Sequence, residues 1–130
     1  MQAADPPRVL IVDDEHVIAD TLAMIFCAAR YDARAVYSAE EAVAMVPGWQ
    51  PQLAIIDVCL PGMNGIDLAV LLKTACPGCR ATLISGAPGT SDLLTVAYPF
   101  EVLAKPVPPA ELLDIASRLL GSSAEKNPAL

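Results

Sequence analysis

The sequence has few basic residues and no long apolar run, and these shortages exclude two kinds of direct partner. Eight Lys and Arg residues stand against 15 Asp and Glu residues, which gives a net charge of −7. Nucleic acids and anionic membranes both attract basic patches, so neither is expected as a direct partner. No apolar stretch approaches the roughly 20 residues that cross a bilayer. The first residues lack the basic segment of a signal peptide, so the cytoplasm is the expected compartment.

Cysteine is also scarce. Four cysteines at irregular spacing do not form the framework of a disulfide-rich fold. Cys76 and Cys79 have the C-x-x-C spacing of redox and zinc sites, but no second pair of ligands accompanies them. Because they precede a predicted strand, we expect them at the amino edge of the sheet. We interpret them as loop thiols, and the sequence assigns them no role.

What the sequence does contain is a regular alternation of strand and helix patterns. Its 130 residues, 55% of them hydrophobic, suffice for one domain with a single core. The expected strands are residues 8–12, 33–37, 53–57, 80–85 and 101–104, and the expected helices are residues 15–29, 39–46, 65–75, 90–98 and 108–120. This alternation predicts an α/β domain with a parallel sheet and right-handed crossovers. The domain is expected to span residues 8–121, between an N-terminal tail (1–7) and a flexible C-terminal tail (122–130).

Local signals predict where helices begin and which faces they bury. Ser38 and Glu41 have the spacing of a capping box, and Asn64 can cap the helix that follows it. In the first helix, the residues that recur at helical spacing are Val17, Ile18, Thr21 with Leu22, and Ile25 with Phe26. We therefore expect that face to lie in the core.

Two predicted strands end on carboxylates. The run Leu53–Asp57 has four apolar residues before Asp57, as in a strand buried on both faces, and residues 9–12 lead into Asp13 and Asp14. Among doubly wound sheets, the order 2-1-3-4-5 places the first and third strands side by side at the switch point. Three carboxylates would then converge, and like charges so close need a compensating cation. Carboxylate oxygens suit Mg²⁺, or Mn²⁺ in its place.

The same edge is predicted to carry a hydroxyl and an ammonium group, from Ser85 and Lys105. With the metal bound, Asp57 can attack phosphorus and form an acyl phosphate. Lys105 would offset the charge on the phosphoryl oxygens, and Ser85 would donate a hydrogen bond to one of them. Because that contact exists only after phosphorylation, the site can act as a switch.

These residues resemble the receiver domain of bacterial two-component response regulators. The resemblance extends from about residue 8 to residue 120, and its most specific segments are residues 9–15, 55–65, 84–86 and 105–106. It implies a flavodoxin-like, doubly wound five-stranded sheet in the order 2-1-3-4-5 with helices on both faces. It also implies that the Lys105–Pro106 peptide bond is cis.

The resemblance further implies a role for each residue of the acidic cluster. Asp57 would be the phosphoacceptor and Asp14 a direct metal ligand. Asp13 would act mainly through water, and the backbone carbonyl of Cys59 would complete the protein ligands. Ser85 and Lys105 would hold the phosphoryl group.

The phosphoryl group would come from a sensor histidine kinase or a histidine phosphotransfer protein of a phosphorelay, which in this family docks largely through the first helix. His16 lies at the start of that helix, and we interpret it as a solvated residue, with kinase contact as the alternative. The chain is expected to be a regulatory phosphoprotein in signal transduction that catalyses at most its own phosphorylation and dephosphorylation. It would act on a downstream protein or a missing output domain. The sequence leaves open the kinase, the target, the phosphoryl lifetime and a phosphorylation-dependent homodimer.

Two departures from the family pattern concern the signalling face. Val102 stands three residues before the lysine, where family members often carry an aromatic residue, so an aromatic switch is in doubt. The segment between Ser85 and Lys105 is compact and is interrupted by proline at positions 88 and 99, which predicts a short or irregular fourth helix.

Three other functions are alternatives to the phosphoacceptor hypothesis. The first is a pseudo-receiver, a protein-interaction module that works without phosphorylation; the intact acids and lysine argue against it. The second is a phosphohydrolase of the haloacid dehalogenase group, which needs an acid two residues after its nucleophile, where Cys59 stands. The third is a flavodoxin-like redox protein, whose first strand should lead into a phosphate-binding loop of small and hydroxyl residues. The acids at positions 13–15 stand there instead and would repel phosphate without a metal.

Overall fold

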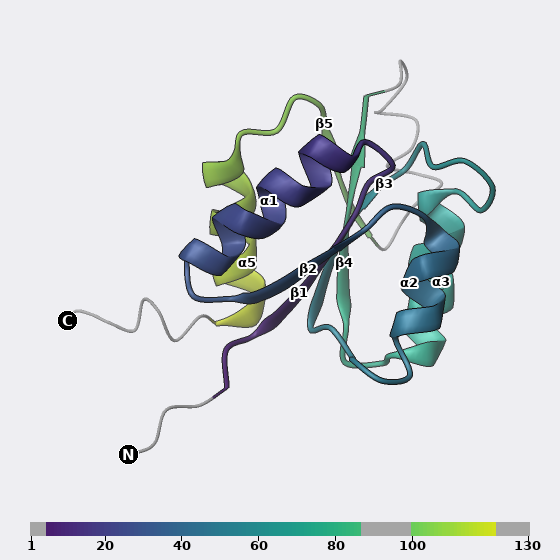
Figure 1. The fold of residues 1–130 in the computed structure, drawn as a ribbon, viewed down its shortest axis with the longest axis horizontal. Helices are drawn as coiled ribbons and strands as arrows, with labels where there is room; N and C mark the ends of the chain where they lie inside the picture. The colour runs from purple at the N-terminus through teal and green to yellow at the C-terminus, as the bar shows by residue number, and fades with distance from the viewer. Residues whose placement is uncertain (1–4, 87–99, 122–130) are drawn as a thin grey trace.

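The computed structural model describes residues 5–86 and 100–121. The strands β1 (Arg8–Val12), β2 (Asp32–Val36), β3 (Leu53–Asp57), β4 (Arg80–Ser85) and β5 (Glu101–Ala104) form one parallel sheet in the order β2-β1-β3-β4-β5. The described helices are α1 (His16–Ala28), α2 (Ala39–Met45), α3 (Gly65–Ala75) and α5 (Pro109–Leu120). In Figure 1, α1 and α5 lie together on one side of the sheet, and α2 and α3 lie on the other. The predicted fold class and strand order are confirmed.

Every predicted strand lies within one residue of its observed position. The predicted helix at residues 90–98 lies outside the described residues, as do residues 1–4 and 122–130 of the predicted tails. That residues 8–121 form a separate domain stays a prediction.

The strand registers bring four strand ends to one edge of the sheet. Val12 of β1 pairs with Ile56 of β3, so Asp13 and Asp57 follow at the same level. Asp57 itself pairs with Ile84 of β4, and the next β4 residue, Ser85, pairs with Ala104 of β5, just before Lys105. Parallel pairing therefore places the predicted site residues at the carboxyl edge of the sheet, where open α/β sheets bind ligands.

The central strand β3 has all five residues buried. Because strand side chains alternate between faces, its residues enter two separate core layers. The layer on the α2 and α3 side includes Leu10, Val12, Ala54, Ile56, Leu83 and Val102, and the layer on the α1 and α5 side includes Val9, Ile11, Leu53, Ile55, Phe26 and Leu112. Asp57 is therefore the last residue of a strand that is held from both sides.

Two predicted helix caps are present, one of them altered. The Asn64 side chain accepts a hydrogen bond from the Asp67 amide at 2.9 Å, and the Ser38 hydroxyl accepts one from the Glu41 amide at 3.1 Å. In a capping box the Glu41 carboxylate would accept from the Ser38 amide, but it accepts from the amide of Tyr37 instead, at 2.9 Å. The side chain thus reaches one residue further than the motif predicts.

The predicted buried face of α1 is correct at Phe26 and Leu22 but wrong at Val17 and Ile18. Their exposed fractions are 79% and 38%, and the buried residues of α1 are Ala19 and Phe26. With the partly buried Leu22, these two residues form the i, i+3, i+7 stripe that faces the sheet. Val17, two residues before Ala19, lies on the opposite side of the helix.

Replacing Thr82 of β4 with valine is expected to increase the free energy of unfolding by about 1 kcal/mol. The Thr82 side chain is fully buried, and among the described residues its hydroxyl has no hydrogen-bond partner. Valine keeps the shape and removes the unsatisfied polar group. Urea unfolding of the two proteins measures the difference; a large loss of stability in Thr82→Val would show that the hydroxyl is satisfied.

Candidate functional site

Three carboxylates meet at the carboxyl edge of the sheet. Asp13 and Asp57 are buried, with exposed fractions of 5% and 6%, whereas Asp14 is exposed. One carboxylate oxygen from each of the three residues lies within 4.8 Å of the others. The structure therefore brings together the three carboxylates that the sequence predicts as metal ligands. Their oxygens are hard donors with one solvent-exposed member, which fits a small divalent cation that keeps some of its water.

Lys105 lies over two of these acids. Its ammonium nitrogen is 2.9 Å from Asp57 Oδ2 and 3.9 Å from Asp13 Oδ2, and the Lys105 amide donates to the Ser85 carbonyl at 2.8 Å. The Lys105–Pro106 peptide bond is cis, as the resemblance implies. The lysine thus provides a positive charge directly at Asp57, on a backbone tied to the end of β4.

The pKa values of Asp13 and Lys105 reflect this crowding. Burial raises the pKa of Asp13, and the negative charges of Asp57 and Asp14 raise it further. The hydrogen bond from the Glu15 amide and the positive charge of Lys105 lower it, but they do not cancel the increase. Burial would lower the pKa of Lys105, but the hydrogen bond to Asp57 and the charges of Asp57 and Asp13 outweigh it, so the pKa is raised. The ammonium group stays charged at neutral pH, and the acids are left with excess negative charge.

Backbone amides orient the two buried carboxylates. The Cys59 amide donates to Asp57 Oδ1 at 3.0 Å, and the Glu15 amide donates to Asp13 Oδ1 at 2.9 Å. The first contact places Cys59 beside the acidic cluster, although the metal-binding role of its carbonyl stays a prediction. Sequence reasoning missed both contacts, although each joins an aspartate to the amide two residues further on, a turn contact that aspartate side chains favour.

Ser85 is buried at the carboxyl end of β4, with an exposed fraction of 1%, and lies on the strand next to Asp57. Its contact with a phosphoryl group remains a prediction.

His16 is exposed, as expected, but its ring stacks on Tyr37 with centroids 3.7 Å apart. The Tyr37 hydroxyl in turn donates to Asp20 at 2.6 Å. This link between α1 and the end of β2 arises from tertiary packing, so no local pattern could have revealed it.

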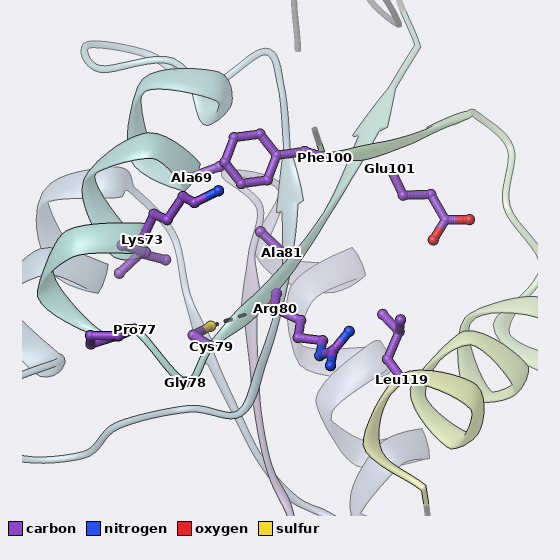
Figure 2. A pocket seen from close by; sticks show the side chains of 11 residues that line it. Ala69, Lys73, Pro77, Gly78, Cys79, Arg80, Ala81, Phe100, Glu101 and Leu119 are labelled. Atoms are coloured by element: carbon purple, nitrogen blue, oxygen red, sulfur yellow. Dashed lines mark hydrogen bonds between the residues drawn. The ribbon is translucent and has the colours of Figure 1, made fainter. Parts of the chain in front are cut away.

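A hollow of about 560 Å³ lies at the opposite end of β4, and its lining includes Lys73, Cys79, Arg80 and Phe100 (Figure 2). Cys76 and Cys79 are both free thiols. Burial and the neighbouring Cys76 raise the pKa of the Cys79 thiol to about 12, and burial also raises the pKa of Cys76. Since thiolates are the reactive and metal-binding form, these values agree with structural thiols.

Asp13→Asn is expected to stabilise the metal-free protein at pH 7 by about 1 kcal/mol. Burial raises the folded-state pKa of Asp13 above its ordinary value of 3.8, so the folded protein holds this proton more tightly than the unfolded chain does. The stabilisation that comes from this tighter proton binding is fully present below about pH 3.8 and is lost as the pH rises through the folded-state pKa of Asp13. The gain from asparagine should therefore vanish near pH 3. Thermal unfolding in EDTA from pH 3 to pH 7 measures this, with Asp114→Asn as the exposed control; a gain that is equal at both pH values would contradict it.

A doubly wound sheet with clustered carboxylates and a lysine at its carboxyl edge defines a regulatory receiver domain. The chain belongs to the response regulator receiver domain family, whose model matches residues 9–117. Receiver domains bind Mg²⁺ at an acidic cluster of this kind, formed here by Asp13, Asp14 and Asp57. The protein is therefore a receiver domain of two-component signalling, with bacterial relatives.

Two relatives illustrate the match in sequence. The DNA-binding response regulator MtrA of Mycolicibacterium paratuberculosis is 29% identical over 108 residues, which are 82% of this chain and 48% of MtrA. A protein of Mycobacterium tuberculosis described as "Probable transcriptional regulatory protein TcrX" is 33% identical over 97 residues, 71% of this chain and 40% of TcrX. The chain thus spans about half the length of the curated relatives it matches.

Solved structures agree with the fold. A CheY-like receiver domain protein from Methanospirillum hungatei JF-1 has a TM-score of 0.78 and 29% identity, over 93% of this chain and 98% of that one. A receiver domain protein from Clostridium thermocellum has a TM-score of 0.80 at 21% identity, over 88% of this chain and 94% of that one, which shows the fold alone. Among the described residues of this chain, no helix is long and apolar enough to span a membrane.

Proposed function

We propose that this chain is a phosphorylation-controlled switch that accepts one phosphoryl group on Asp57 in a Mg²⁺-dependent reaction. One observation carries the proposal: the buried Asp57 carboxylate lies 2.9 Å from the Lys105 ammonium group and within 4.8 Å of Asp13 and Asp14 carboxylate oxygens. An isolated acid at a buried strand end is costly, whereas this set of groups suits phosphoryl transfer.

In the proposed reaction an Asp57 carboxylate oxygen forms a bond to phosphorus, while the bond from phosphorus to the donor histidine nitrogen breaks. The Cys59 amide, on Oδ1, and Lys105, on Oδ2, hold the carboxylate for in-line attack. When bound, Mg²⁺ would neutralise the acids and the phosphoryl oxygens. Asp14 would hold it directly, Asp13 through water, and Cys59 through its carbonyl.

Phosphorylation would be transmitted through the end of β4 and β5. After transfer, Lys105 and Ser85 would both bind phosphoryl oxygens, which pulls on two neighbouring strand ends whose backbones are joined by the 2.8 Å hydrogen bond. Val102 is buried in the α2 and α3 layer, so the conformational change would proceed without an aromatic side chain at this position. The signal would pass to a partner protein or to an output domain outside this chain; a phosphorylation-dependent homodimer stays a prediction.

The proposed donor is a sensor histidine kinase or a histidine phosphotransfer protein that docks on α1. Support comes from the outer face of α1, where Val17 and Met24 have exposed fractions of 79% and 71%. Exposed apolar residues near an acidic catalytic edge suit a helical partner that delivers a histidine.

The proposed compartment is the cytoplasm, where the four free thiols would remain reduced. Residues 8–121 would form the receiver domain, flanked by residues 1–7 and 122–130.

The direct test is incubation with Mg²⁺ and acetyl phosphate, followed by intact-mass measurement. We expect one phosphoryl group per chain and none when EDTA replaces Mg²⁺. If Mg²⁺ binds but no phosphoryl group is added, the protein is better described as a pseudo-receiver that works without phosphorylation.

A further inference from the structure

Helix α3 begins directly against the backbone of the proposed phosphoacceptor. Gly65, the first residue of α3, donates its amide hydrogen to the Val58 carbonyl at 2.9 Å. A Cβ atom built on Gly65 would lie 2.3 Å from the Asp57 carbonyl oxygen and 2.8 Å from the Val58 Cα. Both contacts are with backbone atoms, which cannot rotate away as a side chain can. Only a residue without a side chain allows α3 to start here.

Conformational freedom does not explain this glycine. Among the described glycines, positive φ angles occur at Gly62 and Gly121, and Gly65 is not one of them. Alanine suits the α-helical backbone better than glycine, by about 1 kcal/mol. Glycine is therefore required at position 65 because the start of α3 lies very close to the peptide that joins Asp57 to Val58.

The segment that Gly65 contacts carries the Asp57 side chain and the amide that binds one of its carboxylate oxygens. The Val58 amide donates to the Ile84 carbonyl at 2.9 Å, so β4 holds this segment from one side while α3 holds it from the other. The next amide, of Cys59, binds Asp57 Oδ1 at 3.0 Å. A displacement of the Asp57 carbonyl by a new side chain would therefore move the carboxylate relative to Lys105 and would turn the Cys59 peptide.

We propose that Gly65 is a positioning residue for phosphoryl transfer: by admitting the start of α3, it sets the location of the Asp57–Cys59 backbone relative to Lys105 and Asp13. The inference rests on the proposed function of Asp57. It adds that the distance between helix α3 and strand β3 is part of the site, and that any side chain at position 65 degrades the site beyond its effect on folding.

The first test compares Gly65→Ala with Gly78→Ala, because a Cβ on Gly78 would meet nothing within 4 Å. A misplacement of about 1 Å can cost about 100-fold in rate, so we expect Gly65→Ala to lower the rate constant of phosphorylation by acetyl phosphate about 10- to 100-fold per folded molecule. Its Mg²⁺ affinity, measured by calorimetry, should also fall. Gly78→Ala should match the unsubstituted protein in both. Urea unfolding gives the folded fraction for the correction.

A second pair of variants tests the same idea without adding a Cβ at position 65. Asn64→Ala removes the cap of α3 and Ser38→Ala removes the cap of α2, each at a cost of about 1 kcal/mol in stability. Asn64 directly precedes Gly65 and caps the helix that approaches the Asp57 backbone, whereas Ser38 caps another helix. We therefore expect Asn64→Ala to slow phosphorylation several-fold and Ser38→Ala to leave the rate unchanged. This pair decides the matter if Gly65→Ala does not fold.

Equal phosphorylation rates and Mg²⁺ affinities in folded Gly65→Ala and in Gly78→Ala would overturn the positioning role and leave the proposed function intact. Equal rates in Asn64→Ala and Ser38→Ala would do the same where Gly65→Ala is unfolded. Failure of the unsubstituted protein to take up any phosphoryl group is a different result, since it rejects the proposed function itself.

Discussion

Asp57→Asn is expected to fold normally and to take up no phosphoryl group from acetyl phosphate in the presence of Mg²⁺. The amide keeps the shape of the side chain, and its oxygen can still accept a hydrogen bond from the Cys59 amide. It carries no negative charge, however, and is a far weaker nucleophile than a carboxylate. We expect the amount of phosphoprotein to fall at least about 1000-fold, as is usual when a covalent nucleophile is removed.

Intact-mass measurement after a fixed incubation gives the extent of phosphorylation. Asp67→Asn is the matched control, because it makes the same chemical change on the exposed first turn of α3, outside the acidic cluster. That variant should be phosphorylated like the unsubstituted protein. Uptake of one phosphoryl group by Asp57→Asn at the normal rate would show that another residue is the acceptor.

The stability of Asp57→Asn should change little, because two effects oppose each other. The substitution removes the ion pair with Lys105 at 2.9 Å, but it also removes the repulsion between Asp57 and the buried Asp13. The Lys105 side chain is 32% exposed and its ammonium group still lies 3.9 Å from Asp13, so its charge is not left buried and unpaired, which is the costly case. A cooperative unfolding transition within about 1 kcal/mol of the parent protein would therefore confirm that the loss of phosphorylation is chemical and not structural.

Asp14→Asn is expected to lower Mg²⁺ affinity by about 100-fold and to make phosphorylation depend on much higher Mg²⁺ concentrations. Asp14 is the exposed member of the three-carboxylate cluster, so its replacement should weaken cation binding without disturbing the core. Removing one of three negative charges weakens the attraction for a divalent ion, while Asp13 and Asp57 keep the site in place.

Calorimetric titration with Mg²⁺ measures the affinity directly. Asp114→Asn, an exposed acid on α5 outside the cluster, should bind Mg²⁺ as the parent protein does. Raising the Mg²⁺ concentration should restore phosphorylation of Asp14→Asn but not of Asp57→Asn, which separates a metal ligand from the acceptor. An unchanged affinity in Asp14→Asn would assign the metal to other oxygens.

The carboxyl-edge site was predictable because it depends on patterns that are local in the chain. An uninterrupted apolar run that ends on Asp57, and a second that ends on Asp13, predict buried parallel strands with acids at the same edge. The alternation of strands and helices limits the topology to a few orders, and the order 2-1-3-4-5 joins the two acids. The Asn64 cap was predictable for the same reason, since donor and acceptor are three residues apart.

Other features were decided only by how the elements pack. Helical spacing predicts that one face of α1 is buried, and Phe26 lies on that face as predicted. Ala19 also lies on it and Val17 does not, because the sheet contacts the helix along one narrow stripe.

The sequence by itself therefore determined where the strands lie along the chain and which residues end them, because periodicity and residue type act over short distances. Only the tertiary structure decided the 2.9 Å ion pair between Lys105 and Asp57 and the close approach of Gly65 to the Asp57 backbone. Such distances depend on how β3, β5 and α3 pack together, and residues far apart in the chain leave no local pattern that encodes them.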